Sequence, residues 1–391
     1  MRSRIVVVTF LFLKKQKFFR YNQEWNAEAD AVDAAINPSK TLKYQGAIFC
    51  CVSSWFNYLP TYIVYNKDRL ATISVHSYPE NVCNGNTANL YTLVTSHATP
   101  SSVILKGLPN ATAAGIEYWL GETNSLNSAT QLFSAHNHYT FFFFPRMSSV
   151  ACGGANNVSN TFGSALWGID WIFNSVIQQQ GYRGVNFHGR GTGAYTPIAT
   201  GHPLVARPLY YAMLAVATTI GGSNTYVYPK TQGPSFNYTV QGTILPSQIS
   251  IWTFVDVVSE LRKVVVNNRN LNTTASNANI NITFSTASEL YENAVLSFLS
   301  APSIYSVTGV TFQGQTFDGS ADGSIQGTLV NTTVKASSAA PAGFTWTFTM
   351  KPASTAFLVI CVGQNSVPCG GTSSFSSSSA SRQRSLWTYL L

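Results

Sequence analysis

The sequence predicts an α/β region built on a parallel sheet, followed by an antiparallel β region. Two observations lead to this fold class. Over residues 21–220, short strand-like runs alternate with helical sequence, and strands that are connected through helices pair in parallel. From residue 221 onward, Thr, Val, Ile and Phe alternate with polar residues and are interrupted by Gly, Asn and Ser, which is typical of antiparallel strands. The spacing leaves open whether the parallel sheet is flat or closed into a barrel.

The first region begins with an amphipathic helix over residues 22–36, where apolar side chains recur at three- and four-residue steps. Four strand-like runs follow, at residues 44–51, 71–78, 116–121 and 184–188. A long helix between the third and fourth runs has its apolar face over residues 162–177, and Gly181 is its stop signal. A further helix over residues 208–220 completes this region.

The second region, residues 221–369, is expected to form an antiparallel β-sandwich. Its clearest strands are predicted at residues 279–284, 307–312 and 344–350. Residues 370–391 form a Ser-rich tail that cannot build a core. Residues 1–20 form a basic and apolar leader that shares no pattern with the rest of the chain.

The chain of 391 residues has a formal net charge of +8 and a pI of about 9.1. Six of its 23 basic residues and none of its acidic residues lie in residues 1–20, so the remainder is close to neutral. A nucleic-acid-binding protein needs clustered Lys and Arg, which the body of the chain lacks. The apolar run at residues 5–13 is too short to span a bilayer, and no small-residue cleavage site follows it. We therefore expect neither a nucleic-acid partner nor a membrane span.

The six cysteines form no CxxC pair and have no His at zinc-finger spacing, so we expect disulfides and no metal site. The chain also contains six Asn-x-Ser/Thr sequons, which together with few Lys and many Tyr favour a secreted glycoprotein. The predicted glycosylation sites are Asn110, Asn157, Asn237, Asn272, Asn281 and Asn331. A convincing export signal is absent from residues 1–20, so secretion is argued from the body of the chain.

One motif contains a candidate catalytic residue. Gly121-Glu122-Thr123-Asn124-Ser125 closes a predicted parallel strand and places a carboxylate at its C-terminal end, where catalytic groups project in α/β barrels. Two further stretches accompany it: residues 158–167, VSNTFGSALW, open the long helix, and residues 186–195, NFHGRGTGAY, end the fourth strand. The GRGTG segment lacks the Lys-Ser/Thr of a phosphate-binding loop and the spacing of a dinucleotide site, so it carries no phosphate prediction.

Together these motifs resemble glycoside hydrolase family 79, the β-glucuronidases and heparanases. The similarity covers most of residues 21–362. It implies a (β/α)8 TIM barrel followed by a β-sandwich, and hydrolysis of β-linked glucuronic acid in glycans or proteoglycans with retention of configuration. The family's nucleophile falls on Glu122, and no metal or organic cofactor is implied because two carboxyl groups suffice for this reaction.

The resemblance also suggests substrate-binding residues. His76 and Tyr78 end the second predicted strand, where enzymes of this clan place a Tyr or His that orients the nucleophile. Asn124, His188 and Tyr195 would line the sugar site. Backbone N–H groups of the Gly-rich loop after His188 would receive the uronate carboxylate.

The chain departs from the family in its acid/base residue. That Glu lies in an Asn-Glu-Pro sequence before the first helix, and the chain contains no Asn-Glu-Pro. We therefore expect a partial barrel, about strands five to eight, that is truncated at its N-terminus and inactive as it stands. Glu80 is the other acid near a strand end, but its position gives no reason for it to face Glu122.

A second departure is the insertion at residues 126–149, which separates the nucleophile from a Gly-rich stretch that follows it almost at once in the family. It contains Tyr-Thr-Phe-Phe-Phe-Phe-Pro, a sequence that suits no exposed loop. We hypothesise that residues 126–149 are a retained intron and that residues 1–20 are also spurious, which transcript sequencing would test. The alternative function is a non-catalytic secreted glycan-binding or structural glycoprotein built on the β domain.

Overall fold

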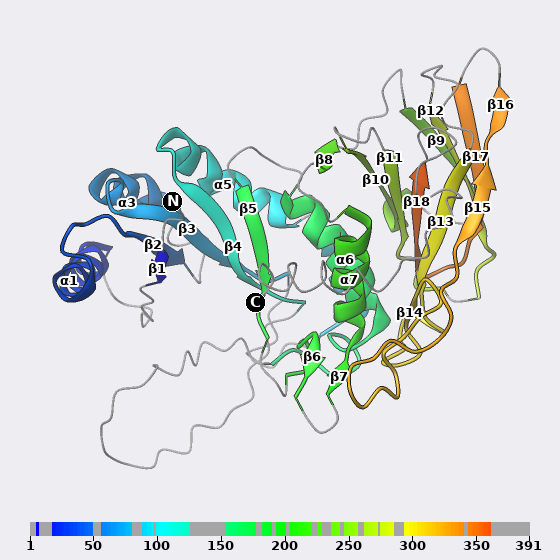
Figure 1. The fold of residues 1–391 in the computed structure, drawn as a ribbon, viewed down its shortest axis with the longest axis horizontal. Coiled ribbons are helices and arrows are strands. Elements are labelled where there is room, and N and C mark those ends of the chain that lie inside the picture. Colours follow the sequence, from blue (N-terminus) through cyan, green and yellow to red (C-terminus); the bar gives the residue numbers. More distant parts are fainter. Residues whose placement is uncertain are drawn as a thin grey trace. The chain divides into compact units, whose positions relative to one another are not determined.

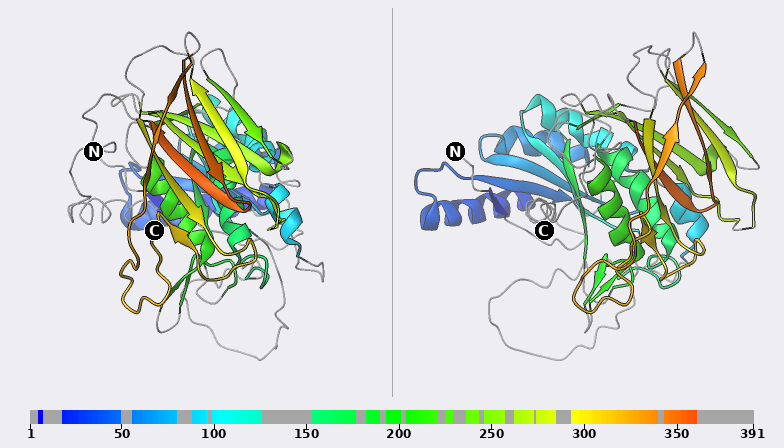
Figure 2. Two further views of the ribbon diagram at one scale, coloured as in Figure 1. Left: turned by 90° about the vertical axis from the view of Figure 1, so that its right-hand side faces the viewer. Right: turned by 45° about the vertical axis from the view of Figure 1, so that its right-hand side comes forward.

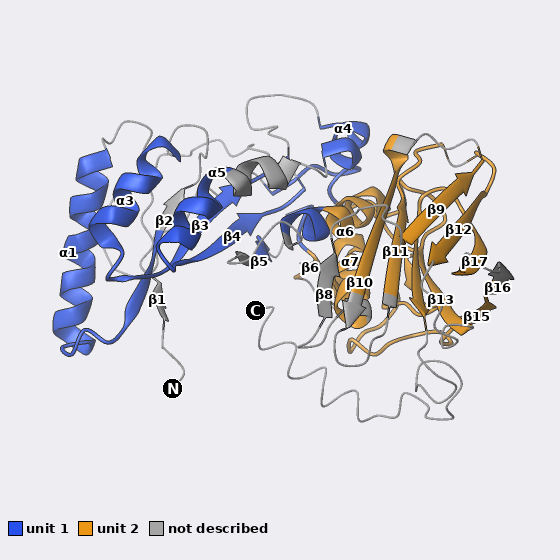
Figure 3. Ribbon diagram, turned by 90° about the horizontal axis from the view of Figure 1, so that it is seen from above, with its two compact units in different colours: residues 1–159, 171–196 blue, residues 160–170, 197–391 orange. Residues whose placement is uncertain are grey.

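A computed structural model provides the structure of the chain. It describes residues 5–7, 18–49, 56–79, 88–96, 99–125, 153–176, 182–189, 193–200, 204–220, 225–228, 236–242, 246–256, 262–272, 274–284, 293–339 and 343–360. The chain divides into two compact units (Figure 3). Unit 1 comprises residues 1–159 and 171–196, and unit 2 comprises residues 160–170 and 197–391. The hypothesised insertion at 126–149, the Ser-rich tail, Glu80 and all six cysteines lie outside the described residues.

Unit 1 is built on a parallel sheet whose strands follow one another in chain order (Figure 1). The strands are β1 (Ile5–Val7), β2 (Lys43–Phe49), β3 (Leu70–Ser77), β4 (Glu117–Thr123) and β5 (Tyr182–Phe187). Each neighbouring pair is parallel. The parallel sheet predicted from the sequence is therefore confirmed, and β1 adds an edge strand inside the segment expected to be a leader.

Helices connect these strands, as parallel pairing requires. They are α1 (Phe18–Ile36), η1 (Phe56–Tyr58), α3 (Leu59–Asn66), α4 (Leu90–Thr95), α5 (Thr99–Ala113) and α6 (Phe162–Val176). Helix α5 packs against β3 and β4. Helix α1 begins four residues before the predicted start because Phe18 and Tyr21 are also buried, with the Phe18 ring stacked on Tyr58 at 5.1 Å.

The core of unit 1 beneath α1 is aromatic. The buried Trp25 ring meets the rings of Tyr44 and Tyr62 edge-on, at centroid distances of 6.0 and 5.7 Å. Gly46 of β2 lies against the same rings, and a Cβ there would stand 2.2 Å from the Tyr62 hydroxyl. Only glycine therefore lets β2 approach this cluster.

Among the described residues, unit 2 contains two large antiparallel sheets and the short antiparallel pair β6–β7, which confirms the second part of the predicted fold class. One has the order β14-β13-β18-β11-β10-β8 with β15 also on β13, and the other β16-β17-β12-β9. The strands are β8 (Thr225–Tyr228), β9 (Phe236–Gln241), β10 (Ile249–Asp256), β11 (Arg262–Asn268), β12 (Ala278–Phe284), β13 (Asn293–Ser300), β14 (Thr311–Phe312), β15 (Thr332–Lys335), β16 (Ser337–Ala339), β17 (Gly343–Met350) and β18 (Ser354–Ile360). Figure 2 shows these strands, coloured green to red, from two further directions. Unit 2 also holds β6 (Ile198–Ala199), β7 (Val205–Ala206), α7 (Pro208–Ile220) and η3 (Pro246–Gln248).

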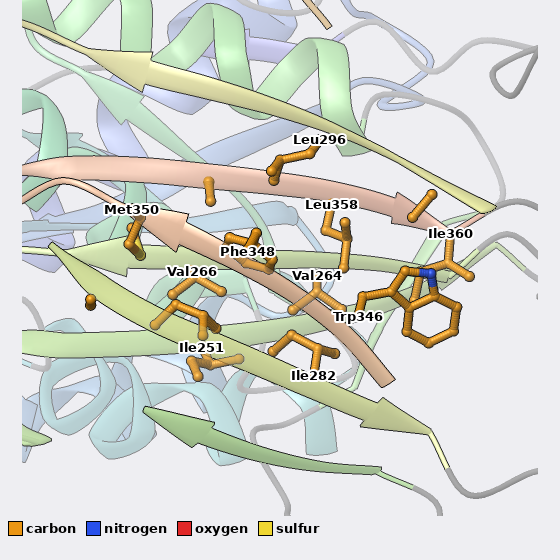
Figure 4. Close-up of a cluster of buried hydrophobic side chains, with 14 of the residues drawn as sticks. Ile251, Val264, Val266, Ile282, Leu296, Trp346, Phe348, Met350, Leu358 and Ile360 are labelled. Carbon is orange, nitrogen blue, oxygen red and sulfur yellow. The ribbon is translucent and has the colours of Figure 1, made fainter. Parts of the chain in front are cut away.

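The two sheets share one apolar core. Buried side chains of β10, β11 and β18 belong to the same cluster as those of β12 and β17 (Figure 4). Ile280 and Ile282 of β12 point inward, whereas Asn279 and Asn281, which alternate with them, are not buried. This alternation is what the period of a strand produces when one face meets a core and the other meets water.

The strand predicted at residues 307–312 forms only over its last two residues, Thr311–Phe312. Gly309 adopts a positive φ of 73°, which interrupts an extended strand. Just before it, the carbonyls of Ile304 and Ser306 accept hydrogen bonds from the first amides of α6, Gly163 and Phe162, at 2.8 and 2.7 Å. Residues 304–306 therefore supply hydrogen-bond acceptors for the N-terminus of α6, which the apolar alternation in the sequence does not reveal.

Within the described residues, no helix combines the length and apolar character needed to cross a membrane.

Candidate active site

The carboxyl ends of β3, β4 and β5 bring together the side chains that the sequence singled out. His76 and Tyr78 come from the end of β3, Glu122 from β4, and His188 directly follows β5. The register places His76 opposite Glu122. Because the strands are parallel, residues at their carboxyl ends meet at one edge of the sheet, which is where α/β proteins bind ligands.

A β-bulge aims Glu122. Val75 pairs with Leu120 and the next pair is His76 with Glu122, so Gly121 is an extra residue in β4. A Cβ at Gly121 would stand 1.7 Å from the Ser74 hydroxyl oxygen, so this position requires glycine. Bulges of this kind redirect side chains next to active sites. The sequence does not reveal this contact with Ser74, although a glycine inside a strand is itself a signal of a bulge.

The Glu122 carboxylate faces one phenol and two imidazoles. Its Oε1 accepts a hydrogen bond from the Tyr78 hydroxyl at 2.6 Å. Its Oε2 lies 3.6 Å from His76 Nδ1 and 3.9 Å from His188 Nδ1. The side chains of Glu122 and His76 are only 10% and 8% exposed. One carboxylate oxygen is thus held by a phenol, while the other faces two imidazoles beyond hydrogen-bond distance.

The environment fixes the protonation of two of these groups. Burial, reinforced by the Glu122 charge and hydrogen bond, raises the pKa of Tyr78, so its hydroxyl stays protonated and donates a hydrogen bond to Glu122. Burial also lowers the pKa of His76; the neighbouring His188 acts in the same direction, while the Glu122 charge opposes them. His76 is therefore neutral at pH 7.

His188 presents a nitrogen that is available for a ligand. Its side chain is 24% exposed, yet its Nε2 is buried and has no hydrogen-bond partner among the described residues. The imidazole meets the Tyr195 ring edge-on at 5.8 Å. A buried polar atom without a partner is uncommon in proteins, and at a strand edge it points to a ligand contact.

Asn124 connects β4 to the loop after β5. Its Nδ2 donates hydrogen bonds to the carbonyls of His188 and Tyr195, at 2.7 and 3.2 Å. Its Oδ1 accepts from the Ser125 amide at 2.7 Å. These contacts are all with backbone, so they hold the loop that carries His188 and Tyr195. The predicted contact of Asn124 with a sugar stays a prediction.

Further hydrogen bonds to backbone carbonyls hold the same edge of the sheet, and the sequence alone does not predict them. The Thr123 hydroxyl donates to the Ser77 carbonyl at 2.6 Å, and the His188 amide donates to the Thr123 carbonyl at 2.8 Å. Gly154 has a positive φ of 78°, and a Cβ there would stand 2.9 Å from the Tyr195 amide. Each strand end is thus tied to the next, which keeps the side chains that face Glu122 in place.

A second carboxylate is not found beside Glu122 in the part of the chain that the structure describes. The ionisable groups that act on His76 and Tyr78 are Glu122, His188 and Tyr195. Glu80, the other acid considered from the sequence, lies outside the described residues. The described residues also contain no group of three His, Cys, Asp or Glu side chains that could hold a metal ion.

Comparison with known proteins identifies the β-sandwich. Residues 254–348 match the family model of the glycosyl hydrolase family 79 C-terminal beta domain. This part of the chain is therefore similar to the C-terminal β domain of that family. No curated protein sequence matches the chain.

Solved structures extend the likeness over most of the chain. A 4-O-α-L-rhamnosyl-β-D-glucuronidase from Fusarium oxysporum 12S, in complex with Rha-GlcA, has a TM-score of 0.60 at 19% identity, covering 86% of this chain and 64% of that one. The α-L-arabinofuranosidase of Thermotoga maritima gives 0.51 at 12% identity, covering 88% and 62%. The family 51 α-L-arabinofuranosidase of Thermotoga petrophila RKU-1 gives 0.52 at 11% identity, covering 87% and 61%.

These likenesses show the fold. The chain shares with these structures a mixed fold, in which an α/β part with a parallel sheet is joined to antiparallel β-sheets, and it spans less than two thirds of their length.

Proposed function

We propose that the chain is part of a retaining glycoside hydrolase that acts on β-linked glucuronic acid, with Glu122 as its nucleophile. The observation that carries the proposal is the geometry at the carboxyl edge of the parallel sheet. Tyr78 holds Oε1 of Glu122 at 2.6 Å, while Oε2 has no hydrogen bond at comparable distance from His76 or His188. A buried carboxylate with one oxygen fixed and the other open is suited to attack on a sugar.

The reaction follows from this arrangement. Oε2 of Glu122 attacks the anomeric carbon, a carbon–oxygen bond to the enzyme forms, and the bond to the departing oxygen breaks. The hydrogen bond from Tyr78 fixes the direction of attack. Because His76 is neutral, it forms no ion pair with Glu122 that would reduce the nucleophilicity of the carboxylate. Water then hydrolyses the glycosyl-enzyme, which restores the original configuration at the anomeric carbon.

The uronic acid class is supported by two considerations. The β domain is that of family 79, and the Fusarium protein of similar fold is a glucuronidase by its description. On the sheet edge, the buried His188 Nε2 offers a donor or acceptor for a polar sugar substituent. Substrate contacts at His188 and Tyr195, and at Asn124 if its amide is freed from the loop, belong to this proposal.

The acid/base residue that protonates the departing oxygen is proposed to come from outside the present sequence. The five-stranded sheet would then supply about strands five to eight of a barrel, with β1 as an additional edge strand. A retaining enzyme needs the two carboxyl groups about 5–5.5 Å apart, so the partner of Glu122 must project from the same carboxyl edge. Secretion as a glycoprotein is part of the same proposal and rests on the sequons.

A fluorosugar with a very good leaving group tests the nucleophile in the chain as it stands. 2,4-Dinitrophenyl 2-deoxy-2-fluoro-β-D-glucuronide needs no protonation to lose its phenolate, and the fluorine slows hydrolysis of the glycosyl-enzyme. We expect stoichiometric labelling, with the sugar on Glu122 in the digested protein by mass spectrometry. Glu122→Gln should remain unlabelled, a loss of at least about 10³-fold in labelling rate.

Glu117→Gln is the matched control, because Glu117 begins the same strand and should leave labelling unchanged. Phenyl β-D-glucuronide, whose leaving group requires protonation, should show no turnover. Labelling of Glu122→Gln at the wild-type rate, or labelling elsewhere, would contradict the assignment. Tight glycan binding by a protein that is never labelled would favour the non-catalytic alternative.

A further inference from the structure

Strand β9 forms an open edge of the smaller sheet in unit 2. Among the strands that the structure describes, β9 pairs with β12 and has no second neighbour. Phe236, Tyr238 and Val240 pack against the sandwich core, and the residues between them are exposed. The other edge of β9 therefore presents its backbone N–H and C=O groups for pairing with another chain.

The composition of β9 favours edge-to-edge association of this strand with other chains. Its six residues, FNYTVQ, contain no charge, no Pro and no Gly, and they are rich in aromatic and β-branched side chains. Such uncharged segments of high β-propensity are the kind that stack edge to edge. Natural proteins guard an edge of this type with Lys, Pro, a bulge or a covering element, and β9 contains neither Lys nor Pro.

A sequon lies within this edge strand. Asn237-Tyr238-Thr239 places Asn237 and Thr239 on the outer face, since residues two apart on a strand share a face. A second sequon, over residues 281–283, lies on the adjacent strand β12. The register sets Asn281 opposite Thr239, and Thr283 opposite Asn237. The two asparagines are thus diagonal neighbours, about 7–8 Å apart.

The two asparagines differ in their surroundings. Asn281 is in a middle strand, where its Nδ2 donates to the Thr239 hydroxyl at 2.9 Å and its Oδ1 accepts from Thr347 at 2.8 Å. Asn237 is exposed on the edge strand, and its Oδ1 accepts from the Tyr238 amide at 2.8 Å. A glycan on Asn281 would disturb a cross-strand ladder, whereas a glycan on Asn237 would disturb none of these side-chain bonds and would lie beside the open edge.

We propose that Asn237 carries an N-linked glycan that shields the β9 edge, and that Asn281 stays unmodified. The inference rests on the proposal that the chain is secreted. In the modification, the Asn237 amide nitrogen bonds to the anomeric carbon of an oligosaccharide on a polyprenyl pyrophosphate. The bond from that carbon to the pyrophosphate oxygen breaks, and the amide loses one proton to solvent. The bulky, hydrated sugar then keeps a second strand from reaching β9.

Site mapping tests the first half of the proposal. The full chain is secreted from a eukaryotic host and treated with a glycan-removing amidase in ¹⁸O water, which marks each formerly glycosylated Asn as an ¹⁸O-labelled Asp. We expect the mark at Asn237 and none at Asn281. A mark at Asn281, or none at Asn237, would overturn the proposal. The readout needs no enzymatic activity, so its failure is distinguishable from failure of the proposed function.

Variants test the shielding. Asn237→Gln removes the glycan with little change in shape, and we expect at least a tenfold faster loss of monomer in light scattering of the secreted protein. Asn237→Lys also removes the glycan but places a charge on the edge, and should restore the monomer. Asn281→Gln is the matched control and should leave both glycan mass and monomer unchanged. An Asn237→Gln protein that stays monomeric as long as wild type would overturn the shielding role.

Discussion

Glu122 of unit 1 and Asp170 of unit 2 are both buried carboxylates, and the difference in their hydrogen-bond partners distinguishes a candidate reactive group from a structural one. In unit 2, Asp170 of α6 is fully buried, and both of its oxygens are occupied. Oδ1 accepts from the Trp252 indole at 2.7 Å, and Oδ2 accepts from the Ser250 hydroxyl and pairs with Arg269 at 2.8 Å. Asp170 has no oxygen left over for a ligand.

In unit 1, Glu122 receives one short hydrogen bond, from Tyr78, and two imidazoles stand farther off. A buried charge that is fully paired stabilises one packing, whereas a buried charge with an open oxygen keeps its reactivity at a cost in stability. The same functional group thus anchors a helix to a sandwich in one unit and forms the candidate active site in the other. The following predictions test this contrast.

The largest change in the free energy of unfolding is expected from Asp170→Asn. Losing the charge leaves Arg269 buried without its ion pair, so we expect a loss of about 3–5 kcal/mol in the free energy of unfolding. Urea unfolding followed through tryptophan fluorescence measures it. Glu122→Gln is the comparison, and it should change stability by less than about 1 kcal/mol or raise it, because no buried partner loses an ion pair. Equal losses in the two variants would break the contrast.

A smaller effect is expected from Asn124→Ala. The carbonyls of His188 and Tyr195 lose a hydrogen-bond donor, which costs about 1–3 kcal/mol. Amides over residues 193–196 should exchange hydrogen faster, and labelling of Glu122 by the fluorosugar should slow by about tenfold, because the loop beside the carboxylate loosens. Ser125→Ala is the control, since the buried Ser125 hydroxyl has no hydrogen-bond partner among the described residues. Unchanged exchange in Asn124→Ala would show that the loop does not depend on this side chain.

The smallest effect is a dependence of stability on pH. Because burial lowers the pKa of His76 in the folded chain, the unfolded chain takes up this proton first as the pH falls below about 6.5. Stability is therefore retained above that pH and lost below it, by at most about 1.4 kcal/mol per pH unit for one proton. His76→Gln should flatten this part of the curve between pH 7 and 5. A His76→Gln curve parallel to wild type in that window would contradict a neutral, buried His76.

Most of the fold could be read from the sequence because the patterns are local. Strands β2 to β5 and the helix at 208–220 lie within a few residues of their predicted bounds. Local patterns failed where a distant partner decided the structure. Residues 307–310 look like a strand, but Gly309 has a positive φ, and the carbonyls just before them, of Ile304 and Ser306, accept hydrogen bonds from the first amides of α6. Helix α1 extends to Phe18, whose ring stacks on Tyr58.

The candidate site shows the same division. Glu122, Tyr78, His76 and His188 could be named in advance because the motifs that contain them resemble glycoside hydrolase family 79 and stand at the ends of predicted strands. The bulge at Gly121 could not, since it depends on the position of Ser74 in the neighbouring strand. The backbone contacts of Asn124 depend in the same way on a loop more than sixty residues away in the chain.

The sequence by itself determined the elements, their parallel or antiparallel pairing, and the residue types at the strand ends, because period and position along the chain are local properties. Only the tertiary structure decided which oxygen of Glu122 accepts from Tyr78, which nitrogen of His188 lacks a partner among the described residues, and that Asp170 is paired with Arg269, Ser250 and Trp252. Hydrogen bonds and charges act over a few ångströms, so their outcome depends on side chains that folding brings together from distant parts of the chain.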